Sequence, residues 1–174
     1  MDVRINASGQ SFKFRVGGII RKGDKFLCVK INKNNFFCLV GGHTELNEDT
    51  ESAVVREIKE ELCVDVKVVA LACIFENFFT TKSGRKFHEL CFAYDVELID
   101  DVDINDYVRM ENDNGEMVKL EFKWLTLEQM RENFKPKALV DVIESGCFKH
   151  LIIKEKWSKY FCKQKYLSLT QLLC

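Results

Sequence analysis

The segment from Asp49 to Leu62 restricts the fold of this chain more than any other. Apolar residues recur there at helical spacing, at Val54, Val55, Ile58 and Leu62, and neither Gly nor Pro interrupts them. Asp49 is a suitable N-cap, so the pattern predicts an amphipathic helix that begins there. Such a helix needs a surface to cover, and the sequence on both sides of it is patterned as strands.

Strand-like runs precede and follow this helix. They are rich in β-branched and aromatic residues and lie at residues 14–20, 25–31, 36–40, 66–75, 87–98 and 120–125. Short polar turns separate the first three runs, which predicts an antiparallel meander. Because the strands do not alternate strictly with helices, we expect an α/β protein of the α+β type. Its sheet is expected to be mixed, with helices on both faces.

Further segments complete the predicted layout. The acidic stretch from Ile99 to Glu116 is typical of an exposed connection. Thr126 and Gln129 form a capping box that opens a helix. Pro136 suits the first turn of another helix, which is expected to end near Gly146.

The last part of the chain, residues 147–174, is basic and aromatic. It carries Lys149, Lys154, Lys156, Lys159, Lys163 and Lys165 against Glu155, with Trp157, Tyr160, Phe161 and Tyr166 between them. We expect a helical C-terminal extension of a single domain whose core covers about residues 12–146. The lysines of this extension are either solvated or in contact with phosphate, nucleic acid or another protein.

Composition limits the classes of function. The 174 residues suit one domain, and 26 basic against 27 acidic residues give a net charge of −1. This balance predicts neither a nucleic-acid partner nor a membrane partner. The start of the chain is polar and no apolar run is long enough to span a bilayer, so we expect a cytoplasmic protein. The eight cysteines form no C-x-x-C pair, which indicates reduced, mostly buried thiols.

Three glutamates share one edge of the predicted helix. Glu57, Glu60 and Glu61 fall within an arc of about 100° at helical spacing, beside the apolar face. Like charges at this spacing repel one another unless a cation lies between them, and hard divalent ions such as Mg²⁺ prefer oxygen ligands. Gly41 and Gly42 precede the helix, where the absence of side chains lets the backbone approach an ion or a phosphate. The alternative is a solvated acidic face paired with Arg56 and Lys59.

The same stretch resembles the Nudix box. Gly42, Glu48, Arg56, Glu57, Ile58, Glu60, Glu61 and Val64 stand at the positions of the pattern G-x5-E-x7-R-E-U-x-E-E-x-G-U, in which U is a bulky aliphatic residue. One position departs, because Cys63 stands where the family has Gly. A Gly at a helix C-terminus commonly adopts left-handed geometry, which costs another residue roughly 1 kcal/mol. The resemblance implies a Nudix-like α/β/α sandwich and a hydrolase of nucleoside diphosphate derivatives.

The resemblance also implies roles within the box. Glu57 and Glu61 are expected to bind Mg²⁺, for which Mn²⁺ is a substitute, together with the Gly41 carbonyl. Glu60 is expected to be a further metal ligand or the base that activates water, and Arg56 to orient Glu57 or Glu48. Glu48 is expected to support these ligands. Catalytic bases outside the box are common in the family, so the alternatives to Glu60 are Glu111, Glu116 and Glu121.

Substrate binding is less well defined by the sequence. Gly42 and His43 lie within the box and are candidates to face phosphate, and Asn77 is a candidate to read the edge of a base. Aromatic candidates to stack on a base are Phe37, Phe75, Phe78 and Phe79. We expect His88 and His150 to be structural or surface histidines.

The predicted function is cleavage of a phosphoanhydride bond by water in a nucleoside triphosphate or nucleoside diphosphate derivative. The family resemblance also implies a homodimer. Two alternatives stay open, namely a catalytically silent Nudix module that binds a nucleotide or protein, and a Nudix-fold isomerase of an isoprenoid diphosphate. The intact set of box acids favours the hydrolase.

Overall fold

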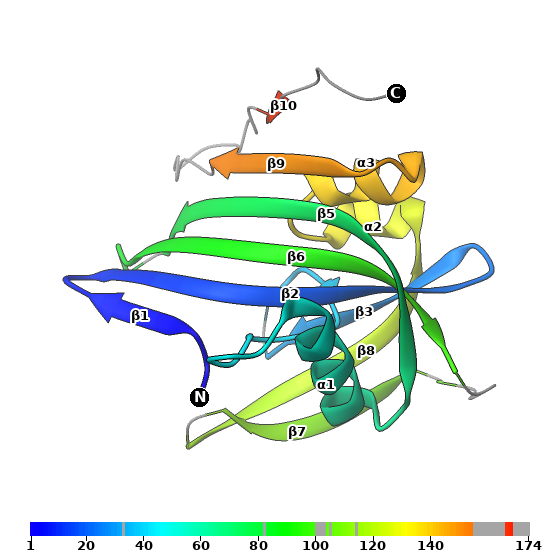
Figure 1. Cartoon of the computed structure of the whole chain (residues 1–174), viewed down its shortest axis with the longest axis horizontal. Coiled ribbons are helices and arrows are strands. Elements are labelled where there is room, and N and C mark those ends of the chain that lie inside the picture. The colour runs from blue at the N-terminus through cyan, green and yellow to red at the C-terminus, as the bar shows by residue number, and fades with distance from the viewer. Residues whose placement is uncertain are drawn as a thin grey trace.

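The computed structural model describes residues 1–32, 34–81, 83–99, 104, 106–113, 115–154 and 166–168. Its elements, in chain order, are β1 (Arg4–Ala7), β2 (Gln10–Lys22), β3 (Lys25–Ile31), β4 (Cys38–Leu39), α1 (Thr50–Leu62), β5 (Val66–Thr80), β6 (Lys86–Leu98), β7 (Tyr107–Asp113), β8 (Glu116–Thr126), α2 (Leu127–Asn133), α3 (Ala138–Ser145), β9 (Lys149–Lys154) and β10 (Tyr166–Ser168). Figure 1 shows their arrangement.

The sheet is mixed, as the sequence predicted. Its strands follow the order β10-β9-β5-β6-β2-β3-β8-β7, with β1 paired to β2 and β4 paired to β3. The pairs β2–β6 and β5–β9 are parallel, whereas the other pairs are antiparallel. Strands β2 and β3 pair only beside their turn, at Arg21–Phe26 and Lys22–Lys25. The sheet therefore opens into two arms, β2–β6–β5–β9 and β3–β8–β7.

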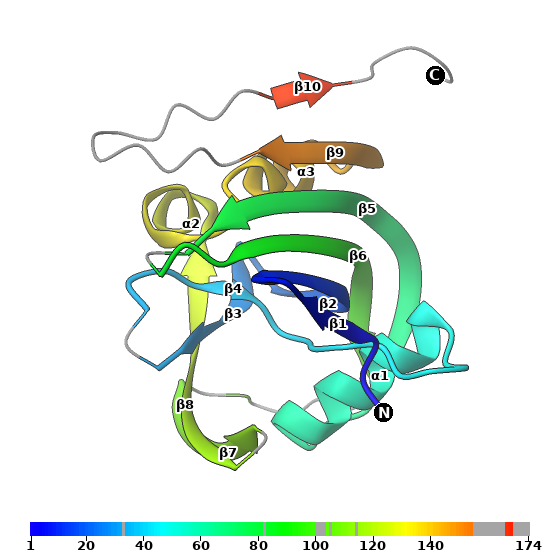
Figure 2. The same ribbon diagram turned by 90° about the vertical axis from the view of Figure 1, so that its left-hand side faces the viewer.

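Helices cover both faces of this sheet, which confirms the expected α+β class (Figure 2). Helix α1 buries Val54 and Ile58 in one hydrophobic core, together with Phe122 of β8. Helices α2 and α3 bury Met130 and Leu139 in a second core, on the other side of the strands. Within the described residues, no helix is long and apolar enough to cross a membrane.

The predicted starts of α1 and α2 and the predicted end of α3 are confirmed, and local hydrogen bonds define them. Pro136 lies before the first turn of α3, not within it, because α3 begins at Ala138 after the N-cap Lys137. The Asp49 side chain accepts a hydrogen bond from the Ser52 amide at 2.9 Å at the start of α1. The Thr126–Gln129 capping box opens α2. Helix α3 ends at Gly146, which adopts the left-handed conformation with φ 62°.

Two segments differ from the prediction. Part of the stretch from Ile99 to Glu116 forms β7, which pairs with β8 across a turn at Gly115. The acidic composition of this stretch obscured the Asn-Gly turn signal in its sequence. Tyr107 of β7 stacks on Phe122 of β8, with 4.7 Å between the ring centroids. Residues 149–154 and 166–168 of the expected helical extension form strands β9 and β10. In β9, Leu151 and Ile153 are buried at a spacing of two, which suits a strand. Residues 155–165 and 169–174 of the expected extension lie outside the described part.

Cysteines are distributed through both cores and the surface. The described residues include six free cysteines, namely Cys28, Cys38, Cys63, Cys73, Cys91 and Cys147. Burial raises the pKa of the Cys38 thiol to about 11 and that of Cys73 to about 12. These two thiols therefore stay protonated at neutral pH and behave as small apolar groups.

Cys63 ends α1 in the left-handed conformation, with φ 58° and ψ 30°. We expect Cys63→Gly to increase the free energy of unfolding by about 0.5–1 kcal/mol. Relief of left-handed strain contributes roughly 1–2 kcal/mol, and the greater freedom of Gly in the unfolded chain removes part of it. Urea unfolding measures the difference. A lower midpoint for Cys63→Gly would show that the Cys63 side chain contributes more than its backbone costs.

Candidate active site

The loop before α1 is held against strand β2. The Val16 amide donates to the Gly42 carbonyl at 3.0 Å, and the Gly18 amide donates to the Val40 carbonyl at 2.9 Å. On the other side, the Val3 amide donates to the Thr44 carbonyl at 2.8 Å. The loop thus lies between β2 and the N-terminal segment, in the opening between the two arms of the sheet. We call residues 40–46 the glycine loop.

Two glutamates of α1 turn toward the glycine loop. Glu57 Oε1 accepts a hydrogen bond from the His43 amide at 3.1 Å, and Glu61 Oε2 accepts one from the Gly41 amide at 3.2 Å. Glu61 is buried, with a relative exposure of 9%. Burial raises the pKa of Glu57 above its usual value, although Arg56 opposes the shift. Both carboxylates are therefore positioned by backbone amides of one short loop.

The absence of a side chain at Gly42 makes room for Glu57. A Cβ atom at position 42 would lie 2.0 Å from Glu57 Oε2. Gly41 has φ 138°, and a Cβ there would lie 2.5 Å from the Val16 carbonyl oxygen. Gly41 therefore permits the backbone path of the loop, and Gly42 permits the position of the carboxylate.

Arg56 joins the loop, the helix and Glu48. Its Nε and Nη2 atoms donate to the two carboxylate oxygens of Glu48 at 2.7 and 2.8 Å. Its Nη1 donates to Glu57 Oε1 at 2.9 Å, and its Nη2 also donates to the His43 carbonyl at 2.9 Å. The Arg56 guanidinium holds the pKa of Glu48 below its usual value. The Glu57 carboxylate is thus fixed from two directions.

Glu60 lies apart from the other two acids of the cluster. Its side chain is 57% exposed, and its closest cation contact is Arg56 Nη1 at 3.5 Å from Oε2. Within the described residues, no three His, Cys, Asp or Glu side chains are arranged so that they enclose a metal ion. The structure therefore brings together Glu57 and Glu61 at the loop, and places Glu60 toward solvent.

The donor atoms at the loop fit a hard divalent cation. The carboxylate oxygens of Glu57 and Glu61 meet at the loop, with no sulfur or imidazole between them. The Gly41 carbonyl, the third expected ligand, accepts a hydrogen bond from Arg15 Nη2 at 3.3 Å. Mg²⁺ and Mn²⁺ prefer such oxygen ligands and retain water in their remaining positions.

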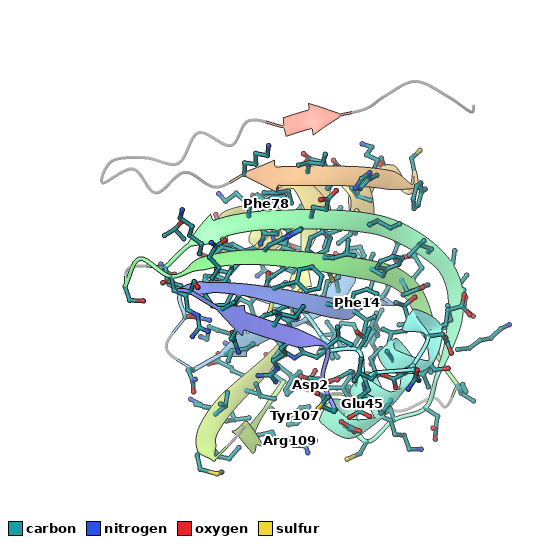
Figure 3. The ribbon with its side chains drawn as sticks, turned by 60° about the vertical axis from the view of Figure 1, so that its left-hand side comes forward. Asp2, Phe14, Glu45, Phe78, Tyr107 and Arg109 are labelled. Atoms are coloured by element: carbon teal, nitrogen blue, oxygen red, sulfur yellow. The ribbon has the colours of Figure 1, made fainter. Side chains whose placement is uncertain are left out.

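Strand β7 fixes the C-terminal end of α1. The Tyr107 hydroxyl donates to the Glu61 carbonyl at 2.8 Å. Arg109 Nη1 donates to the same carbonyl at 3.0 Å and also to the Glu60 carbonyl. A cation at this end of a helix is favourable because the helix dipole is negative there. Figure 3 shows Tyr107 and Arg109 beside α1. Neither residue was predicted as part of the site, because the acidic composition of their segment indicated an exposed connection.

An open cleft of about 540 Å³ lies next to the glycine loop, toward which Leu39 and Arg15 of its lining extend. Residues 40–46 and the glutamates of α1 do not line it. It lies between strands β2, β5 and β6, the segment around β4 and the start of α3. Its aromatic lining comprises Phe36, Phe75, Phe79 and Phe87, and its polar lining includes Lys13, Arg15, Asn77, Glu89 and Lys135. Three cationic side chains against one carboxylate make it suitable for an anionic ligand.

The predicted binding residues divide between the two faces of the sheet. Asn77, Phe75 and Phe79 line the cleft. Phe78 points to the opposite face, where it stacks on His88 at 4.2 Å between ring centroids, because side chains alternate along β5. Phe37 does not line the cleft and packs against the second core.

The three histidines and Glu121 are paired with charged side chains outside the cleft. His43 Nδ1 lies 3.8 Å from Asp2 Oδ2, and the His43 side chain does not line the cleft. His88 and His150 flank Glu76, at 3.8 and 3.0 Å from its carboxylate oxygens. Glu121 forms ion pairs with Lys30 and Lys123. The side chains of Glu111 and Glu116 lie outside the described part.

A mixed sheet with helices on both faces and a carboxylate helix after a Gly-Gly loop is the layout expected of a hydrolase of acid anhydrides. The model of the NUDIX domain matches residues 12–143, and the chain belongs to the NUDIX family. The expectation of a Nudix hydrolase is thereby confirmed.

Individual relatives agree with this assignment. An ADP-ribose pyrophosphatase of Methanocaldococcus jannaschii is 31% identical over 122 residues, which cover 63% of this chain and 72% of that protein. The fold is similar to a mutator MutT protein from Bacillus halodurans, with a TM-score of 0.59, 16% identity and coverage of 88% and 97% of the two chains. It is also similar to a UDP-X diphosphatase, with a TM-score of 0.55 and 18% identity over 82% of this chain and 64% of that one. This chain thus spans just under two thirds of the diphosphatase.

Proposed function

We propose that the protein is a metal-dependent pyrophosphohydrolase that cleaves a phosphoanhydride bond of a nucleoside triphosphate or a nucleoside diphosphate derivative. The observation that carries the proposal is the position of the Glu57 and Glu61 carboxylates at the glycine loop, beside a cationic cleft with aromatic walls. A diphosphate in this cleft has the cation site at one end and room for a nucleoside at the other.

Glu57, Glu61 and the Gly41 carbonyl are the proposed metal ligands, with Mg²⁺ as the metal and Mn²⁺ as a substitute. When bound, the metal offsets the repulsion between the diphosphate and the carboxylates, polarises the phosphoryl group and makes a bound water easier to deprotonate. Arg56 holds Glu57 in place for this task. Glu60 is exposed and lies on the same helix. It is either the proposed base that takes a proton from the attacking water or a further metal ligand.

The substrate class follows from the cleft and from the relatives. Gly42 and His43 of the glycine loop stay proposed phosphate-binding residues, although they do not line the cleft, and Asn77, which lines it, offers its amide to the base or sugar. Phe75 and Phe79 replace Phe78 as the proposed stacking residues, because they line the cleft. The relative named as an ADP-ribose pyrophosphatase makes ADP-ribose the first substrate to test. A cytoplasmic location, a homodimer and a role for the basic C-terminal segment stay predictions.

Product release from a panel of phosphate compounds tests the function. The panel comprises ADP-ribose, nucleoside triphosphates, oxidised nucleotides, dinucleoside polyphosphates and sugar nucleotides, each with Mg²⁺ or Mn²⁺. We expect metal-dependent turnover, and a loss of about 10²–10⁴-fold in Glu60→Gln if Glu60 is the base. Glu51→Gln is the matched control, since Glu51 is exposed in the first turn of the same helix.

Other outcomes would favour the alternatives. Nucleotide binding by the folded protein without turnover of any compound would indicate a silent binding module. Rearranged isoprenoid diphosphate without release of phosphate products would indicate an isomerase.

A further inference from the structure

Arg15 occupies the boundary between the glycine loop and the cleft. It lies in the middle of β2 and lines the cleft, and its side chain is 24% exposed. Its Nη2 lies 3.3 Å from the Gly41 carbonyl oxygen, and its Nε lies 3.5 Å from the Gly42 carbonyl oxygen. Its Nη1 lies 3.9 Å from Glu89 Oε1.

These oxygen contacts are long for a guanidinium. Charge-assisted N–H···O bonds are commonly about 2.7–2.9 Å, and the Arg15 side-chain contacts to the Gly41 and Gly42 carbonyls and to Glu89, all within the described part of the chain, are longer than that. By comparison, Arg56 approaches Glu48 to 2.7 and 2.8 Å. Glu89 is a nearby anion, and it lies no closer than 3.9 Å to Arg15 Nη1, so a ligand that supplies oxygen atoms at about 2.7–2.9 Å would give the guanidinium closer partners.

The remaining polar residues of the cleft indicate which ligand atoms approach Arg15. Lys13 Nζ lies 5.2 Å from the centroid of the Phe87 ring, and Lys135 Nζ lies 5.2 Å from that of Phe36. These lysines therefore lie at the aromatic walls, and Arg15 contacts the glycine loop. When the nucleoside lies between the aromatic walls and the diphosphate lies at the glycine loop, Arg15 lies between them. The phosphate that is bonded to the nucleoside is then the phosphate next to Arg15.

We infer that Arg15 binds the phosphate that is attached to the nucleoside. Its planar group accommodates two phosphate oxygens at once. Glu89 Oε1 lies 3.9 Å from the guanidinium, and the Asn77 amide donates to Glu89 Oε2 at 3.4 Å. This inference rests on the proposed function to the extent that the substrate is a nucleotide derivative. It assigns a substrate-binding role to Arg15, which lies outside the carboxylate cluster.

Ligand binding without metal and without turnover tests the inference. Calorimetry in EDTA compares four nucleoside monophosphates with their parent nucleosides. For at least one pair, we expect wild-type protein to bind the monophosphate about 10- to 100-fold more tightly, the factor typical of a hydrogen bond to a charged group. Arg15→Met is expected to reduce this ratio to near one. Arg21→Met is the matched control, because Arg21 is an exposed arginine on the same strand and lies over Phe26.

Arg15→Lys keeps the experiment decisive if Arg15→Met does not fold. Lysine retains the charge without the planar fork, so an intermediate ratio is expected. An unchanged ratio in a folded Arg15 variant would overturn the inference, and so would a wild-type protein that does not prefer any monophosphate over its nucleoside. Because no hydrolysis is measured, a failure of the proposed activity is distinguishable from a failure of the Arg15 assignment.

Discussion

Glu57→Gln is expected to lower the rate of hydrolysis by about 10³-fold while the protein stays folded. The loss follows from removal of a charged metal ligand that acts on the transition state, a change typically worth several kcal/mol. Gln has nearly the same shape and can still accept the hydrogen bond from the His43 amide. Because burial already disfavours the charge on Glu57, its removal is expected to change the free energy of unfolding by no more than about 1 kcal/mol.

Three measurements on the same preparation check this result. Turnover with Mg²⁺ or Mn²⁺ gives the rate, calorimetric titration with Mn²⁺ gives metal affinity, and urea unfolding gives stability. Glu51→Gln, on the same helix, is expected to leave all three unchanged. Retention of wild-type turnover and Mn²⁺ affinity in Glu57→Gln would remove Glu57 from the proposed metal site.

Alanine at the two glycines of the loop is expected to produce two different defects. Gly41→Ala forces a side chain onto a backbone with φ 138° and against the Val16 carbonyl oxygen at 2.5 Å. The backbone conformation of residue 41 and the Val16 carbonyl cannot adjust easily, so we expect a loss of about 2–3 kcal/mol in the free energy of unfolding. At Gly42, the three atoms nearest to an added Cβ all belong to the end of the Glu57 side chain, with Oε2 at 2.0 Å, and that side chain can rotate when its bonds to the His43 amide and Arg56 break. Stability is then nearly retained, but turnover falls by about 10²–10³-fold because the carboxylate is displaced.

Urea unfolding and turnover, measured in parallel, separate the two defects. The pair serves as its own control, since both variants add one methyl group to neighbouring residues. Equal losses of stability in the two variants would contradict the distinction between a backbone constraint and a carboxylate position. Full turnover in Gly42→Ala would show that Glu57 does not need the position seen here.

Local signals in the sequence were sufficient for the helices. The N-cap at Asp49, the capping box at Thr126 and the left-handed Gly146 each act within one turn of the chain, so no tertiary contact is needed to recognise them. Strands β7 and β9 were missed for the opposite reason. Their pairing partners, β8 and β5, are separate elements, and alternation over so few residues is a weak signal.

The Arg15 position was also inaccessible to sequence reasoning. Its place at the site depends on the contact of β2 with a loop 26 residues further along the chain. The same holds for Tyr107 and Arg109, which reach the end of α1 from almost 50 residues away. A single charged residue in a strand pattern carries no indication of such a contact.

The sequence by itself determined that Glu57, Glu60 and Glu61 share one helix after a Gly-Gly loop, because helical spacing is a property of the local chain. Only the tertiary structure decided that Glu57 and Glu61 face the loop while Glu60 faces solvent. It also decided that Phe75 and Phe79 line the cleft and that Phe78 does not. The physical reason is that the direction of a side chain follows from packing and strand pairing, which residues distant in the sequence impose.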